Sequence, residues 1–235
     1  MKVVSVNLME SAEMFPAQSY SSLKLFDQCP RKYYHLRVVK DVREPVSEAM
    51  SYGTNMHKAA EDYVKDGVPL PAHFTYIKST LDNLMRFEGE RLCEYKLGLT
   101  AKLEPCGFND KNVWFRGIID LVILNHDAGE ARIVDYKTGK SAKYADTGQL
   151  ELMALGLFKH FPTIKKIKAG LLFVTCNTFI KDKYDISMEP KLWQKWLRQY
   201  TRIETAYTTD VWNPNPSGLC RRHCAVLSCS HNGRA

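Results

Sequence analysis

Two aspartates and a lysine have the types and spacing that metal-assisted hydrolysis needs. Asp120 lies in one apolar, β-branched run, residues 113–122, and Asp135, Tyr136 and Lys137 follow the next, residues 131–134, with a short turn-rich stretch between the two runs. This pattern predicts a β-hairpin in which the two acids lie side by side, with Asp135 and Lys137 on one face. Mg²⁺ takes carboxylate oxygens and keeps other positions for water and phosphate. The trio therefore indicates metal-dependent phosphodiester cleavage, whereas Asp-x-Lys taken alone is equally consistent with a solvated ion pair before a turn.

A helical stretch upstream offers a further ligand. His57 and Glu61 are four residues apart and share one helix face. An imidazole suits Mn²⁺ better than Mg²⁺. An isolated His-x-x-x-Glu is more often a surface pair, but beside the hairpin acids His57 becomes a candidate metal ligand and Glu61 a secondary one.

Taken in order, these segments resemble the PD-(D/E)XK nuclease superfamily in its RecB-like branch. The matching motifs are Gly-Thr-x-x-His ending at His57, Gly-Ile-Ile-Asp ending at Asp120, Asp-Tyr-Lys-Thr-Gly beginning at Asp135, and a helix with Gln149. The branch includes nuclease domains of bacterial recombination helicase–nucleases, CRISPR-associated RecB-like exonucleases and small phage proteins. One position departs from it: four residues after Gln149, where the branch often has Tyr, this chain has Met153.

The resemblance implies two overlapping sets of site residues. The catalytic residues would be Asp120, Asp135, Lys137 and Gln149. Mg²⁺ or Mn²⁺ would be held by His57, Asp120, Asp135 and the backbone carbonyl of Tyr136.

Four cysteines extend the resemblance to both ends of the chain. Residues 20–34 are similar to the family's Ser-x-Ser…Cys-Pro-x-x-Tyr helix. In iron–sulfur members its cysteine is the first cluster ligand and three more follow near the C-terminus, which implies a [4Fe–4S] cluster on Cys29, Cys220, Cys224 and Cys229. From spacing alone, a Zn²⁺ site, with His223 or His231 replacing Cys29, and a tail without metal remain alternatives. The other three cysteines, Cys93, Cys106 and Cys176, are expected to be core thiols.

Length and composition favour a single domain with an anionic partner. The chain has 235 residues, 45% of them hydrophobic, with no long linker or repeat, so we expect one nuclease domain over residues 1–235. Within it the helix at 20–37 should pack with the cysteine-rich tail, 211–235. The net charge of +7 and pI near 9.0 favour DNA.

Aromatic side chains among the basic clusters suggest what form the DNA takes. Tyr33, Tyr34, Tyr136 and Tyr144 interleave with lysines and arginines, as in grooves that bind single strands or free ends. The alternative is a solvated basic surface with core aromatics.

Seven cysteines, no signal peptide and no membrane-length apolar run predict no membrane association and a reducing, cytoplasmic location. The resemblance suggests a bacterial or phage-infected cell.

The hydrophobic pattern along the chain predicts the helices and strands of a mixed sheet. We expect helices near 21–37, 52–65, 73–95, 145–160 and 189–207, and strands near 99–105, 112–124, 130–136 and 167–176. This order predicts an α/β fold with a restriction-endonuclease-like core, in which helices flank a mixed central sheet, together with a C-terminal cysteine-rich metal clasp.

The expected function is that of a metal-dependent DNA nuclease, specifically an exonuclease acting in DNA processing, recombination or repair. The alternative is a non-cleaving DNA-binding accessory protein of the same fold. The complete Asp…Asp-x-Lys set favours the enzyme, and nothing in the sequence separates an exonuclease from an endonuclease.

Overall fold

The computed structural model describes residues 15–45 and 47–234, which divide into two compact units. Of the described residues, the first unit holds 15–17 and 47–193, and the second holds 18–45 and 194–234. The segments 20–37 and 211–234 therefore belong to the same unit. The single domain over residues 1–235 stays a prediction.

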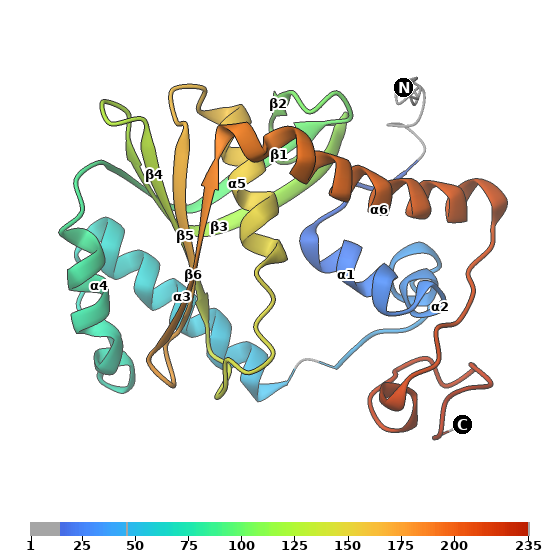
Figure 1. The fold of residues 1–235 in the computed structure, drawn as a ribbon. Coiled ribbons are helices and arrows are strands. Elements are labelled where there is room, and N and C mark those ends of the chain that lie inside the picture. Colours follow the sequence, from blue (N-terminus) through green and yellow to red (C-terminus); the bar gives the residue numbers. More distant parts are fainter. Residues whose placement is uncertain (1–14, 46, 235) are drawn as a thin grey trace. The chain divides into compact units, whose positions relative to one another are not determined.

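The first unit is built on one six-stranded sheet (Figure 1). Its order is β2-β1-β3-β4-β5-β6; β4 and β5 are parallel, and the other neighbours are antiparallel. The strands are β1 (Glu90–Thr100), β2 (Pro105–Cys106), β3 (Val113–Asn125), β4 (Glu130–Lys137), β5 (Lys166–Phe173) and β6 (Thr178–Asp185). Helix α5 (Gly148–His160) makes the crossover that the parallel pair requires. The predicted α/β class with a mixed central sheet is confirmed.

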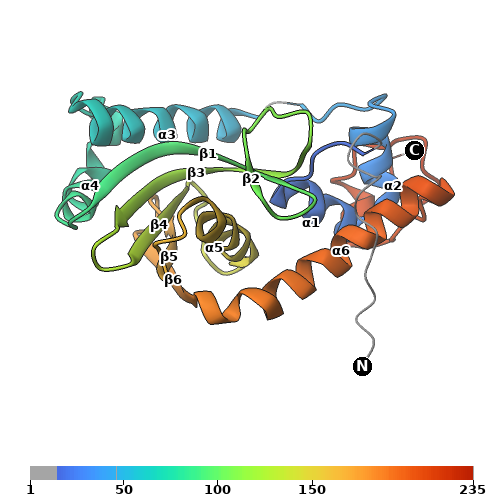
Figure 2. The same cartoon turned by 90° about the horizontal axis from the view of Figure 1, so that it is seen from above.

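Helices cover both faces of this sheet (Figure 2). One face is covered by α3 (Glu48–Asp66), η2 (Ala72–Ile77) and α4 (Lys78–Met85), and the other by α5. The core under α3 and α4 joins helix side chains such as Met56 and Leu81 to strand side chains such as Leu121 and Val134. Burying each such side chain contributes about 1.5–3 kcal/mol, so these contacts fix α3 against the strands that carry the acids.

Local signals set the ends of α3. The side chain of Ser47 caps its first turn by accepting a hydrogen bond from the Met50 amide, and Gly67 ends it with φ of +67°. Because Met56 and Ala60 face the core, the neighbouring His57 is held at the edge of the buried face.

The helix predicted over 73–95 is only half correct, because the chain turns at Gly89 and continues as β1. Gly89 has φ of +130°, and a β-carbon there would overlap the backbone carbonyl of Leu124. Only glycine fits this close approach. Strand β6 was not predicted. It is an edge strand, and its alternating pattern places charged side chains outward, so it lacks an apolar run.

The second unit is helical. It contains α1 (Tyr20–Gln28), α2 (Pro30–Tyr33), η1 (Tyr34–Val38), the part of α6 (Glu189–Thr209) that follows Trp193, and η4 (Gly218–Arg221), while η3 (Ile186–Met188) belongs to the first unit. Tyr33 stacks on Trp212 with ring centroids 6.0 Å apart, and Gln199 donates a hydrogen bond to Asp27. These contacts join α1 and α2 to α6 and to the chain that follows it.

Candidate active site

The two acids occupy the point where β3 and β4 stop pairing. The last paired residues on this side are Leu121 and Val134, so Asp120 and Asp135 are the next residues on the two strands. Both carboxylates are buried, with exposed fractions of 8% and 3%. A buried carboxylate needs hydrogen bonds or ion pairs, and each acid has its own set.

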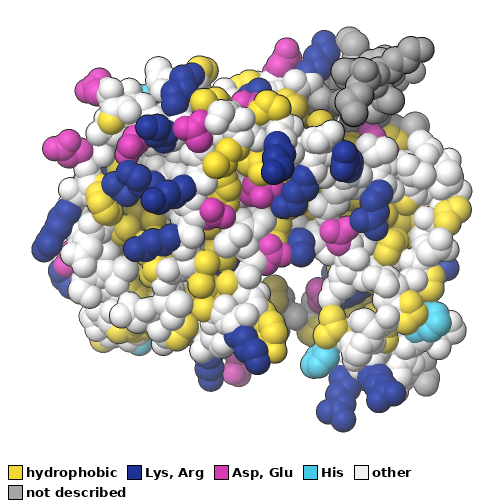
Figure 3. Space-filling view, in the orientation of Figure 1, with side chains coloured by type: hydrophobic (Ala, Val, Ile, Leu, Met, Phe, Trp, Pro, Cys, Tyr) yellow, Lys and Arg dark blue, Asp and Glu magenta, His cyan; other side chains and the backbone are white. Residues whose placement is uncertain are grey.

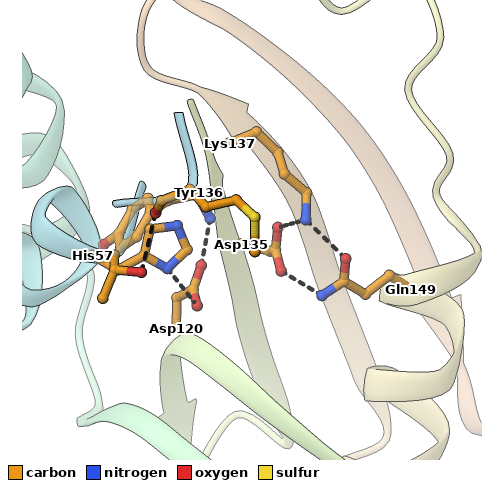
Figure 4. A network of polar contacts seen from close by, with 8 residues as sticks. His57, Asp120, Asp135, Tyr136, Lys137 and Gln149 are labelled. Carbon is orange, nitrogen blue, oxygen red and sulfur yellow. Dashed lines mark hydrogen bonds and ion pairs between the residues drawn. The ribbon is translucent and has the colours of Figure 1, made fainter. Parts of the chain in front are cut away.

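Asp120 is held from two sides (Figure 4). Its Oδ2 accepts a hydrogen bond of 2.6 Å from the Tyr136 backbone amide, and its Oδ1 lies 3.2 Å from Nδ1 of His57. The carboxylate is thereby oriented by the neighbouring strand and joined to α3.

Asp135 belongs to a closed triangle with Lys137 and Gln149 (Figure 4). Lys137 Nζ lies 2.6 Å from Asp135 Oδ2 and donates to Gln149 Oε1 at 2.8 Å, while Gln149 Nε2 donates to Asp135 Oδ1 at 2.7 Å. Strand alternation places Asp135 and Lys137 together, with Tyr136 in the opposite core, as predicted. Gln149 reaches them from the first turn of α5.

A third acid, Glu94, completes a set of ligand atoms. The β1–β3 register on either side places Glu94 across from Asp120, and its backbone has the unusual φ of +50°. Among the described residues, His57, Glu94 and Asp120 are the one group that brings three potential metal-ligand atoms within 4.8 Å of one another. Sequence reasoning missed Glu94 because its segment was assigned to a helix.

The electrostatics of the site show an excess of negative charge. Burial and the charge of Asp120 raise the pKa of Asp135 to about 6, although Lys137 opposes the shift. Burial and Asp120 also raise the pKa of Glu94. Burial tends to lower the pKa of His57, but its contact with Asp120 and the charges of the three acids outweigh this and raise it. The part of each shift that comes from the neighbouring acids favours a positive charge among them.

The donor set therefore fits a divalent cation. One imidazole and two carboxylates offer nitrogen and oxygen ligands of the kind that Mn²⁺ and, for the oxygens, Mg²⁺ accept. His57 and Glu94 open on a cavity of about 380 Å³, which is also lined by Gly53, Thr54, Lys58 and Glu61. Glu61 lines this cavity, but it pairs with Lys58 and Lys65.

The sequence-predicted residues thus gather at one place, in two subsets. His57 and Asp120 share the cluster with Glu94, whereas Asp135 lies beside it and is paired with Lys137 and Gln149. The Tyr136 amide touches Asp120, and its carbonyl as a metal ligand stays a prediction.

For two of the four tyrosines expected to stack on DNA bases, the prediction is wrong. Tyr33 and Tyr136 are 1% and 3% exposed and belong to the cores. Tyr34 packs on Trp212, with ring centroids 5.2 Å apart. Tyr144, by contrast, is 86% exposed.

The four candidate cluster cysteines meet in the second unit. A small cavity there is lined by Cys29, Cys220, Cys224 and Cys229, together with His231. The backbone amides of Asn215 and Ser217 donate to the sulfurs of Cys29 and Cys220, each at 3.4 Å. All four thiols are free.

The other three cysteines differ from the expected core thiols. Cys93 and Cys106 are half-buried and Cys176 is exposed, because it lies in the turn between β5 and β6.

Within the described residues, no helix is both long and apolar enough to cross a membrane.

Comparison with solved structures finds similar folds at low sequence identity. A proposed exonuclease from Eubacterium rectale matches with a TM-score of 0.52 and 13% identity, over 95% of this chain and 92% of its own. The protein SSO0001 matches with a TM-score of 0.43 and 13% identity, over 96% of this chain and 93% of its own. No curated protein sequence matches.

The family comparison is decisive. The model of the PD-(D/E)XK nuclease superfamily matches residues 17–229, nearly the whole chain. The match includes the two acids Asp120 and Asp135, then Lys137, then α5. It also includes both cysteine-bearing segments. The chain therefore belongs to the PD-(D/E)XK nuclease superfamily.

Proposed function

We propose that this protein is a metal-dependent deoxyribonuclease of the RecB-like branch, acting as an exonuclease. The observation that carries the proposal is the convergence of His57, Glu94 and Asp120 within 4.8 Å, directly beside the paired Asp135 and Lys137. A metal-ligand cluster next to a carboxylate–ammonium pair is what phosphodiester hydrolysis requires.

The proposed metal is Mg²⁺ or Mn²⁺, held by His57, Glu94 and Asp120, with Asp135 and the Tyr136 carbonyl as further candidates. When bound, a divalent cation supplies Lewis acidity toward the phosphate and lowers the pKa of a coordinated water. The excess negative charge described above supports the assignment.

The residues beside the metal cluster have roles of their own. Lys137 is positioned to orient the attacking water or to neutralise charge that develops on the phosphate. Asp135 and Gln149 hold its ammonium group at 2.6 and 2.8 Å, which fixes the lysine in one place. Gln149 has its amide nitrogen on Asp135 and thereby ties α5 to the site.

A basic strip supports DNA as the partner. On the face of the sheet shared with α3, strands β5 and β6 expose four lysines, Lys166, Lys168, Lys181 and Lys183. Arg132 on β4 is beside them, and its guanidinium lies 3.7 Å from the Phe87 ring centroid. Figure 3 shows Lys and Arg side chains gathered on the side of the view where these strands lie. Such a surface suits a phosphate backbone.

We also propose that Cys29, Cys220, Cys224 and Cys229 hold a [4Fe–4S] cluster as a structural clasp, with Zn²⁺ as the alternative. Support comes from their shared cavity and from the two amide–sulfur hydrogen bonds, which stabilise thiolates. Free thiols of this kind need a reducing compartment such as the cytoplasm. Anaerobic purification with metal analysis distinguishes about four iron atoms per chain from one zinc.

The decisive test of the proposed activity uses end-labelled linear and circular DNA, single- and double-stranded, with Mg²⁺, Mn²⁺ or EDTA. We expect metal-dependent loss of label from linear DNA, with circles left intact. Cleavage of circles would make the protein an endonuclease. DNA binding without cleavage under every metal condition would leave the accessory role instead.

A further inference from the structure

The side chain of Tyr144 projects into solvent from the loop between β4 and α5. At 86%, its exposed fraction exceeds that of the other large hydrophobic side chains in the described chain, the next being Met50 at 58%. The ring buries little apolar surface within the fold and stays accessible to a partner. A single exposed ring is common on protein surfaces, so what surrounds Tyr144 decides what it could bind.

The loop that carries this ring is ordered by its own hydrogen bonds. Gly139 is anchored through its carbonyl by the Thr175 hydroxyl at 2.7 Å. The Ser141 hydroxyl accepts from the Lys143 amide, and the Ala142 carbonyl accepts from the Ala145 amide. The ring is thus presented by a formed turn.

Both ends of this loop are site residues. It begins directly after Lys137 and leads into α5, where Gln149 bonds to Asp135. Tyr144 precedes Gln149 by five residues, so their α-carbons are at most about 18 Å apart. At a rise of 3.4 Å per nucleotide, that reach covers about five nucleotides from the reacting phosphate.

The chemistry around the ring matches that of a nucleotide. Lys143 lies over one side, with Nζ 5.4 Å from the ring centroid, and Lys140 is exposed in the same loop. The ring can stack on a nucleobase while the ammonium groups meet its phosphate. A base inside a duplex already has neighbours on both faces, so the ring selects an unpaired one.

We propose that Tyr144 is a stacking platform for an unpaired nucleotide within about five nucleotides of the cleaved bond. This inference rests on the proposed nuclease function and names its substrate class: a single strand, or a duplex end that is frayed or overhanging. The loop then places an unpaired strand between a phosphate-binding lysine and the Asp135–Lys137 pair.

The test uses metal-free protein in EDTA and single-stranded oligonucleotides that carry 2-aminopurine at successive positions from either end. Stacking on Tyr144 quenches the fluorescence at one or two positions. We expect the quenching to be kept in Tyr144→Phe, lost in Tyr144→Ala and unchanged in Tyr76→Ala, another exposed tyrosine of the same unit.

The same variants are then compared in cleavage assays. Tyr144→Ala should raise KM for single-stranded DNA about fivefold or more, as expected for loss of one base–aromatic stack, and change KM for blunt duplex much less. Rescue by Tyr144→Phe separates stacking from a role of the hydroxyl.

The outcomes separate the two proposals. Quenching that depends on Tyr144, without cleavage under any metal condition, keeps the platform and refutes the nuclease. Cleavage with wild-type quenching and KM in Tyr144→Ala refutes the platform and keeps the nuclease. A Tyr144→Phe variant as defective as Tyr144→Ala also refutes stacking.

Discussion

Asp120 is the residue at which the site is assembled, because it contacts or faces three other elements. It accepts from the Tyr136 amide of β4, lies against His57 of α3, and faces Glu94 of β1. The sequence predicted Asp120, Asp135 and Lys137, since strand alternation alone places them. Glu94 could not be predicted as a site residue in this way, because its place beside Asp120 depends on β1, and the sequence pattern predicted a helix there.

Removing either member of the Asp135–Lys137 pair should abolish cleavage. Asp135→Asn or Lys137→Ala leaves an incomplete triangle with Gln149, so we expect a loss of at least about 1,000-fold in kcat, since such residues act as a unit. The double variant should be hardly worse than either single one. Wild-type rates in Asp135→Asn would remove these residues from the mechanism, and DNA binding in EDTA serves as the control for folding.

Glu94 and Glu61 provide a matched comparison for metal binding. Both line the same cavity, but only Glu94 belongs to the three-residue ligand cluster, while Glu61 pairs with lysines. We expect Glu94→Gln to weaken Mn²⁺ binding by about 100-fold or more, and Glu61→Gln by much less. Titration calorimetry measures the Mn²⁺ affinity of both variants. Equal losses of affinity would show that Glu94 is no more important for metal binding than Glu61.

The raised pKa of Asp135, about 6, predicts how metal-free stability depends on pH. The folded protein holds this proton more tightly than the unfolded chain, so the stabilisation is complete below the ordinary aspartate pKa and is lost as pH rises through about 6. Asp135→Asn, which resembles the protonated acid, should therefore match wild type near pH 4. It should be more stable at pH 8 by about 2 kcal/mol.

Urea unfolding in metal-free buffer at both pH values measures this difference. A gain that is the same at pH 4 and pH 8 would contradict it. Added Mg²⁺ should stabilise the wild type at pH 8 and reduce the gap.

At the scale of elements, the sheet carries the candidate site on its central strands and a basic strip beside it. The site lies where β3 and β4 separate, and the lysines of β5 and β6 extend over the neighbouring face. β3, β4 and α5 were predictable because each contains a long apolar run bounded by turn or cap residues. β1 and β6 were not, because the first begins at a glycine turn and the second is an edge strand rich in charge.

Reversing charge on β6 should weaken DNA binding through its salt dependence. Lys181→Glu with Lys183→Glu should lower affinity at low salt and reduce the slope of log K against log salt by about 1.5, if each lysine meets one phosphate. The control is Lys102→Glu with Lys111→Glu, two exposed lysines outside the strip with the same change in net charge. Equal effects of the two pairs would mean that only net charge matters.

At the scale of the whole molecule, the four-cysteine cavity joins segments from opposite ends of the described chain. The sequence could predict which cysteines meet, through their resemblance to a known motif, but not that a separate unit forms around them. That boundary depends on packing between α1, α2 and the chain after α6, which no local pattern encodes.

If the four cysteines hold the proposed metal cluster, Cys29→Ser should release the metal and destabilise the second unit. A crosslink that closes a loop of this length contributes about 2–4 kcal/mol, so we expect a loss of that order in unfolding free energy. Cys176→Ser, at an exposed turn outside the cavity, should change neither metal content nor stability. Retention of full metal by Cys29→Ser would exclude it as a ligand.

The second unit also has a consequence for synthesis. Its two segments, 18–45 and 194–234, are separated by nearly all of the first unit. At about 5–20 residues per second, a ribosome needs on the order of 10 s to make the intervening chain. Throughout that time Phe26 and Tyr33 have no Trp212 to pack against, although they are buried in the finished protein. The nascent chain thus exposes an uncovered apolar surface in residues 18–45, and chaperone binding there would protect it until residues 194–234 emerge.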